Sequence, residues 1–259
     1  MSEIVIEPWM RGVVPGIHPV IGHLLRAAFS KQQPLFAVNS AGCFPYASGF
    51  PSIDMLGLND FHIARYHPKD MGNGIIGHEL GDGTYVLNRN PDLVQFNGLG
   101  GDARIPSYRG DIEMYNAAEF KQHYRIVFFR TGDTTLPLWV RIENGRLGIT
   151  RSETKLSIPG YFLATSPNVP AILGMNGTLA ASLQGNASEL EDVYVPPGHW
   201  QFSIDTDASS HLQVEVLSST GAAREQWDRG DVFSDGAPRS FRVRGSGLVY
   251  SITALRLPE

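Results

Sequence analysis

Apolar residues in the first half of the chain follow two different spacings. Over residues 17–30 they recur at a nearly helical period, which predicts an amphipathic helix. Continuous apolar runs at 35–38, 52–56 and 92–96 are typical of strands that are buried on both faces. A helix-like stretch at 84–88 precedes the third run. This order of elements predicts a small, mainly parallel sheet with helices packed against it.

Two further strand-like segments follow, at 125–129 and 138–142. The turn-forming sequence at 143–146 predicts a hairpin between the second of these segments and residues 147–149. We therefore expect antiparallel strands at the edge of the parallel sheet, within an α/β domain that spans residues 1–170.

The chain after residue 170 contains no helix-like segment and shows strict period-2 alternation in several short runs. Clusters of Gly, Pro, Asp and Ser separate these runs, a pattern typical of antiparallel β-sandwiches. We therefore predict a jelly-roll-like sandwich, similar to a carbohydrate-binding module, over residues 171–259. The predicted fold class of the whole chain is α/β plus all-β. The alternation assigns these residues to the sandwich core: Trp200, Phe202, Val214, Val216, Phe241, Val243 and Tyr250.

Charge and composition narrow the classes of partner. The 259 residues carry a formal net charge of -5, so the chain lacks the basic surplus that holds a phosphate backbone, and we expect no nucleic-acid partner. No segment approaches the ~20 apolar residues needed to cross a bilayer, and residues 1–10 lack the features of a signal peptide, so we expect a soluble chain. The single cysteine, Cys43, excludes an internal disulfide, and we expect it to be a small buried thiol.

The densest group of polar residues lies between residues 54 and 82. Its histidines and carboxylates are the side chains that bind zinc or divide acid and base roles in catalysis. The same residue types also cap helices and brace turns, and the sequence around His78 lacks the second histidine of the zinc-protease helix motif. Both interpretations remain open for the group, which consists of Asp54, Asn59, Asp60, His62, Arg65, His67, His78, Glu79 and Asp82.

Asp54 stands out because it interrupts an apolar run near the carboxyl end of a predicted parallel strand, where open α/β sheets bind their ligands. A buried aspartate requires a cation or several hydrogen-bond donors. We therefore predict that its carboxylate meets Arg65, a histidine or the backbone N–H groups of residues 57–62, either to brace the turn or to contact a ligand.

The second half offers one candidate platform for a sugar ring. Trp227 lies in a polar stretch and is expected to be exposed, and aromatic faces can pack against sugars. The nearby Asp228, Asp231 and Asp235 are weak candidates for calcium binding through their oxygen atoms. We expect no other cofactor and no other metal.

Three runs are familiar as an ordered set: residues 37–46, residues 53–64, and residues 77–87 with Pro91-Asp92. Together they resemble the soluble C-terminal region of bacterial membrane glycosyltransferases of the GT-C type, arabinofuranosyltransferase-like or mannosyltransferase-like proteins. The resemblance covers roughly residues 35–165. Residues 177–180 and 195–200 also look like the β-rich module that ends such proteins.

The resemblance implies an extracytoplasmic, periplasmic domain beside the transmembrane part of an enzyme that uses a lipid-linked sugar donor. In that family the catalytic carboxylate lies in a loop between transmembrane helices, and this sequence has no such helices. The chain is therefore expected to be non-catalytic and to contact an acceptor glycan or polysaccharide in cell-envelope synthesis.

Two other functions stay open. A free-standing hydrolase would use Asp54, Asp60, His78 and Glu79. A protein-interaction module would bind no glycan.

Overall fold

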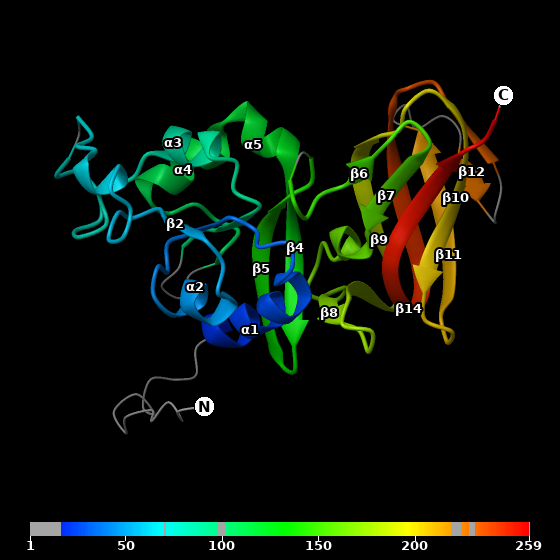
Figure 1. Cartoon of the computed structure of the whole chain (residues 1–259), viewed down its shortest axis with the longest axis horizontal. Helices are drawn as coiled ribbons and strands as arrows, with labels where there is room; N and C mark the ends of the chain where they lie inside the picture. Colours follow the sequence, from blue (N-terminus) through cyan, green and yellow to red (C-terminus); the bar gives the residue numbers. More distant parts are fainter. Residues whose placement is uncertain are drawn as a thin grey trace.

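The computed structural model describes residues 17–69, 71–97, 102–143, 145–218, 224–227 and 231–258. Of these, Ile17, His18, Ser218, Asp231 and residues 224–227 are described for the backbone alone. Two regions follow each other along the long axis of the molecule (Figure 1). The N-terminal region, residues 17–143, carries the α-helices, and the C-terminal region, residues 145–258, is built almost entirely from strands.

The N-terminal region contains short helices and short strands, followed by one long hairpin. In chain order they are α1 (Ile17–Phe29), β1 (Phe36–Val38), α2 (Cys43–Ser48), β2 (Ser52–Asp54), the 3-10 helix η2 (Ile63–Arg65), α3 (Gly83–Asn88), β3 (Leu93–Gln95), α4 (Arg109–Asn116), α5 (Ala118–His123), β4 (Tyr124–Thr131) and β5 (Thr134–Arg141).

The C-terminal region contains longer strands. In chain order its elements are β6 (Thr150–Arg151), β7 (Lys155–Pro159), the 3-10 helix η3 (Gly160–Leu163), β8 (Ala171–Leu173), β9 (Leu179–Tyr194), β10 (Gly198–Thr206), β11 (His211–Ser218), β12 (Arg224–Trp227), β13 (Asp231–Ser234) and β14 (Pro238–Arg256).

Helices cover both faces of the short parallel strands. β1 pairs in parallel with β2 on one side and with β3 on the other. Along β1 the side chains alternate between faces, so Phe36 and Val38 belong to the core under α1 and α2, and Ala37 belongs to the core shared with α3, α4 and α5. The packing of α1 on α2 is tight, because a Cβ atom at Gly22 would lie 2.8 Å from the Ala47 Cβ.

The C-terminal region is organised around β14. The first half of β14 pairs with β9 and β11, and its second half pairs with β10 and β7. The pairing register shifts at residues 244–246 of β14 and at residues 205–206 of β10. Such irregularities bend a strand, which allows β14 to pair with two strands in each half. The two halves pack on a shared core, in which Phe202 of β10 contacts Phe241 of β14 with ring centroids 5.4 Å apart.

The predicted fold class, a small mainly parallel α/β domain followed by a separate jelly-roll-like sandwich, is wrong. The fourteen strands in the described part of the chain form one sheet, in the order β12-β11-β14-β9-β8-β4-β5-β3-β1-β2, with β6, β7, β10 and β13 attached to its side. Among the described residues, parallel pairing joins only β1 to β2, β1 to β3 and one residue pair of β4 and β8.

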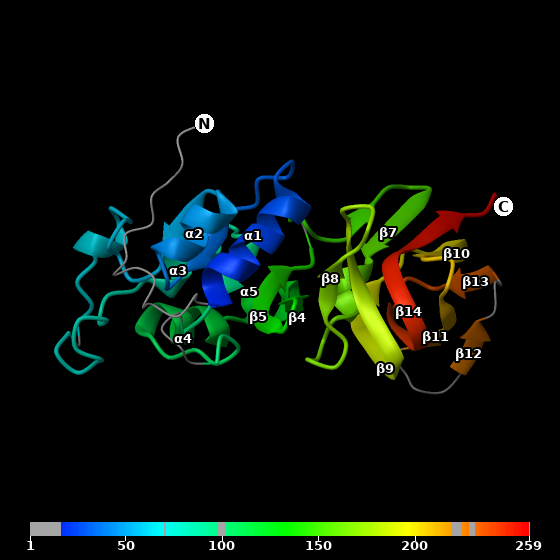
Figure 2. The same cartoon turned by 90° about the horizontal axis from the view of Figure 1, so that it is seen from below.

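The sheet is mostly antiparallel because its long strands, both the β4–β5 hairpin and the strands around β14, pair antiparallel. β4 and β5 pair over eight residues each, whereas the parallel strands contribute three residues each. β8 then connects β4 to β9 and carries the sheet into the C-terminal region. One hydrophobic core contains residues of both regions, from Ile21 of α1 to Trp200 of β10. In a perpendicular view the two regions remain end to end (Figure 2).

Most individual elements lie where the hydrophobic pattern predicts them. Helices α4 and α5 occupy residues 109–123, for which the pattern indicated no element. The turn expected around 143–146 brings the Ile149 N–H to the Ile142 carbonyl at 2.8 Å, but the described residues 147–149 form no strand, and the carboxylate of Asp92 accepts a hydrogen bond from the Arg146 N–H in this turn. Tyr250 is half-buried and Val249 takes its place in the core, because the register shift in β14 moves the inward face by one residue.

Candidate functional site

Asp54 ends β2 and braces the turn that follows it. The residue is 3 % exposed. Oδ1 accepts a hydrogen bond from the Leu56 N–H at 3.0 Å, and Oδ2 accepts one from the Asn59 N–H at 2.6 Å. The prediction of backbone partners is thus confirmed. Arg65 instead stacks on the Phe61 ring, with its guanidinium carbon 3.4 Å from the ring centroid.

Asp60 braces the next turn in the same way. Its Oδ1 accepts hydrogen bonds from the N–H groups of His62 and Ile63, each at 3.0 Å, and so opens the 3-10 helix η2. Its Oδ2 accepts a hydrogen bond from the Tyr85 hydroxyl at 3.2 Å. Asp60 therefore joins the loop after β2 to helix α3.

His62 lies at the centre of a group of aromatic and charged side chains. Its Nε2 is 2.8 Å from Oδ2 of Asp82, whose Oδ1 accepts a hydrogen bond from the Tyr85 N–H and caps α3. The imidazole ring lies nearly parallel to the rings of Tyr85 and Tyr66, with centroid distances of 4.0 and 5.9 Å. The Arg89 guanidinium donates to the Tyr85 hydroxyl at 2.7 Å. We call these five residues the His62 cluster.

His78 and Glu79 belong to a second group, anchored on α4. The His78 ring stacks on Tyr108 with the centroids 5.3 Å apart. The Glu79 carboxylate accepts a hydrogen bond from the Gly72 N–H at 2.5 Å, and its carbonyl accepts one from the Arg109 Nε at 3.2 Å. Glu79 therefore closes the loop at 72–79.

The predicted site residues therefore fall into three groups. Asp54 braces a turn together with the backbone of Asn59, whose side chain is exposed. Asp60, His62 and Asp82 meet at the start of α3, whereas His78 and Glu79 lie by α4.

The aspartates of this site hold the backbone of the surrounding loops and of α3. Asp54, Asp60 and Asp82 each accept at least one backbone N–H hydrogen bond. In the described part of the chain, no three His, Cys, Asp or Glu residues are placed to hold a metal ion. What the site offers to a ligand is a set of partly exposed rings with hydrogen-bonding groups beside them.

A buried pair at the carboxyl ends of the parallel strands was not predicted. The Asn39 side-chain amide, just after β1, donates to both carboxylate oxygens of Asp111 at 2.8 Å. Burial raises the pKa of Asp111, and the hydrogen bonds from Asn39 and from backbone N–H groups oppose that rise. The sequence signal was the asparagine directly after an apolar run, but its partner lies on α4, a helix that the pattern did not indicate.

The candidates of the C-terminal region are only partly described. The backbone of Trp227 pairs with Val214, but the side chain lies outside the described residues, as do Asp228 and the side chain of Asp231. Asp235 is exposed and accepts hydrogen bonds from the Ala237 N–H at 3.0 Å and from Arg239 at 3.1 Å. The Ala237 hydrogen bond is the main cause of its lowered pKa. Asp235 therefore holds a turn.

Two other features lie away from these groups. A groove of about 670 Å³ runs between α1, the β4–β5 turn and β8, and residues such as Leu24, Arg130 and Ile172 line it. None of the predicted site residues lines this groove. Cys43, expected to be buried, is exposed because it starts α2 at the surface.

No helix among the described residues combines the length and the apolar composition needed to cross a membrane. No curated protein and no solved structure matches the chain. A family model with the description "Domain of unknown function (DUF8728)" matches residues 12–147. These residues comprise the whole described N-terminal region and more than half of the chain, and they include the His62 cluster. The chain belongs to this family of domains of unknown function.

Proposed function

We propose that the chain is a non-catalytic, glycan-contacting domain that acts at the extracytoplasmic face of the bacterial membrane, beside a membrane glycosyltransferase of cell-envelope polysaccharide synthesis. The acceptor glycan lies against the His62 cluster. The location and the enzyme partner come from the resemblance of residues 35–165 to such proteins. The binding role comes from the geometry of the cluster.

The observation that carries the proposal is the parallel arrangement of Tyr66, His62 and Tyr85 next to fixed charged groups. Sugar rings present C–H faces that pack on aromatic rings and hydroxyl groups that require hydrogen-bond partners. The exposed Arg89 guanidinium provides hydrogen-bond donors beside these rings, and Asp82 holds the His62 ring in place. Tyr66 and Arg89 are exposed, so a ligand can reach both kinds of group.

The carboxylates of the site already accept backbone hydrogen bonds, which favours a binding role over hydrolysis. A general acid or base exchanges protons with its substrate and has to reach the reacting atoms. Asp54 is buried, with each oxygen held by a backbone N–H, and Glu79 is held by the Gly72 N–H. A hydrolytic role would require breaking hydrogen bonds that keep the loops in place.

The binding role is tested by an NMR titration of the chain with fragments of arabinan, mannan and lipopolysaccharide. We expect shifts at His62 and Tyr66 with a Kd in the millimolar range, corresponding to about -4 kcal/mol. Replacing Tyr66 by Ala removes one exposed ring and should weaken binding about three- to tenfold. Phe233→Ala, which removes an exposed ring of the C-terminal region, is the matched control and should leave binding unchanged.

Three outcomes would contradict the proposal. Shifts that map around Trp227 would move the glycan site to the C-terminal region. The absence of shifts with every glycan would leave a protein-interaction role. Release of sugar from any fragment during the titration would show catalysis.

A further inference from the structure

The loops after β2 expose an unusual amount of apolar surface. Large apolar side chains of this apical segment, defined as residues 57–69 and 71–79, face solvent: Leu58, Phe61, Tyr66, Met71, Ile75 and Ile76. Leu58 is 83 % exposed, Phe61 73 % and Ile76 92 %. Single exposed apolar residues are ordinary, whereas a concentration of them marks a contact surface for a protein or a membrane.

The two isoleucines lie at a tight turn. The His78 N–H donates to the Ile75 carbonyl at 2.8 Å, which closes a four-residue turn, and Gly77 has a φ of 77° at its third position. Turns at protein surfaces ordinarily carry Gly, Pro, Asn, Asp or Ser at these positions. The Glu79 carboxylate fixes the base of this loop through the Gly72 N–H. The fold therefore holds two large apolar side chains in water at a fixed position.

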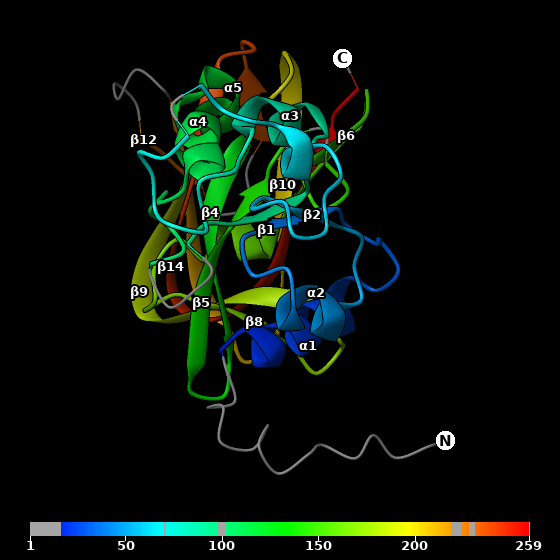
Figure 3. The ribbon, with the colours of Figure 1, turned by 90° about the vertical axis from the view of Figure 1, so that its left-hand side faces the viewer.

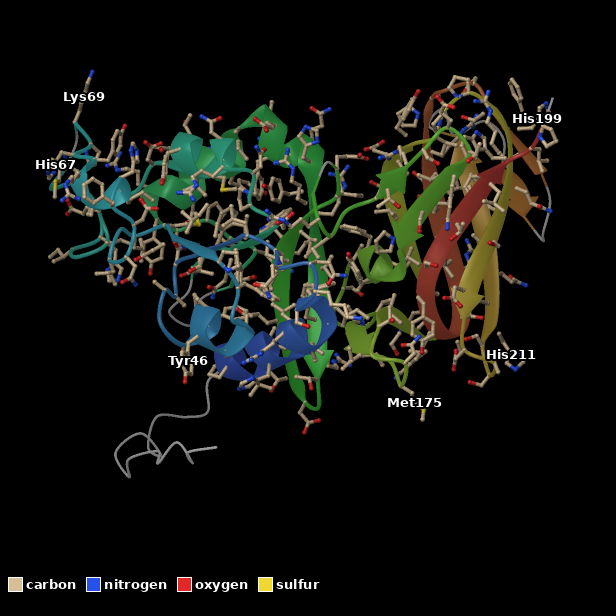
Figure 4. All side chains as sticks on the ribbon, viewed as in Figure 1. Tyr46, His67, Lys69, Met175, His199 and His211 are labelled. Carbon is tan, nitrogen blue, oxygen red and sulfur yellow. The ribbon has the colours of Figure 1, made fainter. Side chains whose placement is uncertain are left out.

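The apical segment also exposes two cationic side chains, Arg65 and Lys69, and the imidazole of His67. Of the described carboxylates of the segment, that of Asp60 is buried, and that of the half-buried Glu79 accepts a hydrogen bond from the Gly72 N–H. His67 and Lys69 project from the end of the molecule farthest from the C-terminal region (Figure 4). Viewed from that end, the cyan loops of the segment lie in front of the remaining elements (Figure 3).

We infer that the apical segment docks the protein on a bilayer that contains anionic phospholipid. Leu58, Phe61 and Ile76 insert among the acyl chains near the headgroups, and Arg65 and Lys69 remain at the phosphate level. The side chains stand almost fully clear of the protein surface, which suits insertion into a deformable medium. A protein partner would require a pre-shaped surface against which such side chains pack.

This inference is independent of glycan binding. It depends on the apolar side chains and the two cations that are assigned to the bilayer, none of which belongs to the His62 cluster. Tyr66, which does belong to that cluster, is not among the side chains proposed to insert. Docking on the membrane would place the His62 cluster close to the bilayer, since residues 57–79 surround His62 in the chain. Either proposal can fail while the other stands.

The test is co-sedimentation of the whole chain with vesicles of phosphatidylcholine alone and of phosphatidylcholine with about one third phosphatidylglycerol. We expect binding to the mixed vesicles that weakens as salt is raised. The double variant Leu58→Ser, Ile76→Ser should bind about tenfold more weakly or worse, since two inserted side chains are lost. Arg65→Gln and Lys69→Gln should each reduce binding to the mixed vesicles about fivefold.

The control is Met175→Ser, which replaces a fully exposed apolar side chain in the turn between β8 and β9 (Figure 4). It should bind as the wild type does. Circular dichroism and thermal unfolding of each variant confirm that the fold is retained. The inference is overturned if the wild type binds neither kind of vesicle, if the double variant binds unchanged, or if Met175→Ser loses as much binding as the double variant.

Discussion

The two regions of the molecule bury different kinds of polar group. Every buried charged residue among the described ones belongs to the N-terminal region: Asp54, Asp60, Asp92, Asp111 and Arg141. The buried polar residues of the C-terminal region are serines: Ser182, Ser188 and Ser234. The charged residues on its strands stay nearer to water, as in the pair of Arg242 with Glu189 at 2.6 Å.

The difference follows from strand length. Long antiparallel strands satisfy their backbone groups in their own ladders, and β14 alone pairs with four other strands. The three-residue parallel strands end in loops whose N–H groups need other partners. Buried carboxylates provide these partners. The carboxylate of Asp92, for example, accepts hydrogen bonds from the N–H groups of Leu35 and Arg146 and so connects two loops.

The comparison separates a scaffold from a recognition surface. The C-terminal region is held by apolar packing and by the backbone hydrogen bonds of its strands. The N-terminal region uses buried carboxylates to fix loops, and those loops carry the His62 cluster and the apical segment. Functional residues are commonly placed on loops that a rigid framework positions.

The largest expected effect is the loss of the main core side chain of the C-terminal region. Trp200 is fully buried, and its Nε1 donates to the Pro196 carbonyl at 2.8 Å. Trp200→Ala should lower the free energy of unfolding by about 3–5 kcal/mol, because it leaves a large cavity. Urea denaturation followed by circular dichroism measures the change.

Phe233→Ala is the control for this prediction, since Phe233 is an exposed ring in the same region. Its effect should stay within about 0.5 kcal/mol. Equal effects of the two substitutions would show that apolar packing does not distinguish core from surface in the C-terminal region.

A smaller effect is expected for a carboxylate that braces a loop. Asp54→Asn keeps the size of the side chain but removes its charge and turns one acceptor into a donor. The free energy of unfolding should fall by about 1–3 kcal/mol, the amount typical when a hydrogen bond to a charged group is lost. Asp235→Asn, at an exposed turn of the C-terminal region, should cost less than about 0.5 kcal/mol. Similar losses for both would remove the distinction between the two regions.

The smallest effects concern pH, and two aspartates, Asp111 of the N-terminal region and Asp207 of the C-terminal region, should respond with opposite signs. Burial raises the pKa of Asp111, so the folded state favours its protonated form and loses stability as pH rises from the ordinary aspartate pKa of about 4 through the raised value. Hydrogen bonds from the hydroxyls of Ser209 and Ser210 lower the pKa of Asp207 to about 2, so its contribution to stability is lost as pH falls from about 4 toward 2.

Thermal unfolding of wild type, Asp111→Asn and Asp207→Asn between pH 2.5 and 7 checks these signs. Relative to its variant, the wild type should lose stability toward high pH in the Asp111 comparison and toward low pH in the Asp207 comparison. Parallel curves for all three proteins would contradict the assignment.

The spacing of apolar residues predicted α1, the strands β1 to β5 and the long strands β9, β10, β11 and β14, but it did not predict β6, β7, β8, β12 or β13. It failed where packing between distant segments decides the structure. Helices α4 and α5 have few apolar residues, and their inward side chains, such as Met114 and Phe120, face a core that only the folded sheet creates. The sequence pattern also could not predict that one sheet passes through both regions, because the two parts of the sheet are joined by a single residue pair between β4 and β8.

Part of the site could be predicted for a physical reason. A carboxylate inside an apolar run must find donors, and for Asp54 the nearest donors are the N–H groups of the next turn. The stacking of His62 with Tyr85 could not be predicted, because it depends on how α3 packs against the loop after β2. The pattern gave no sign that Tyr66 and Arg89 would join them.

The central claim is that buried carboxylates hold the loops that carry the recognition surface. Amide hydrogen exchange of wild type and Asp54→Asn tests it most directly. The N–H groups of Leu56 and Asn59 should lose at least about tenfold of their protection in the variant, because each donates to the Asp54 carboxylate. The N–H of Ile252 in β14 should keep its protection. Unchanged protection at Leu56 and Asn59 would contradict the claim.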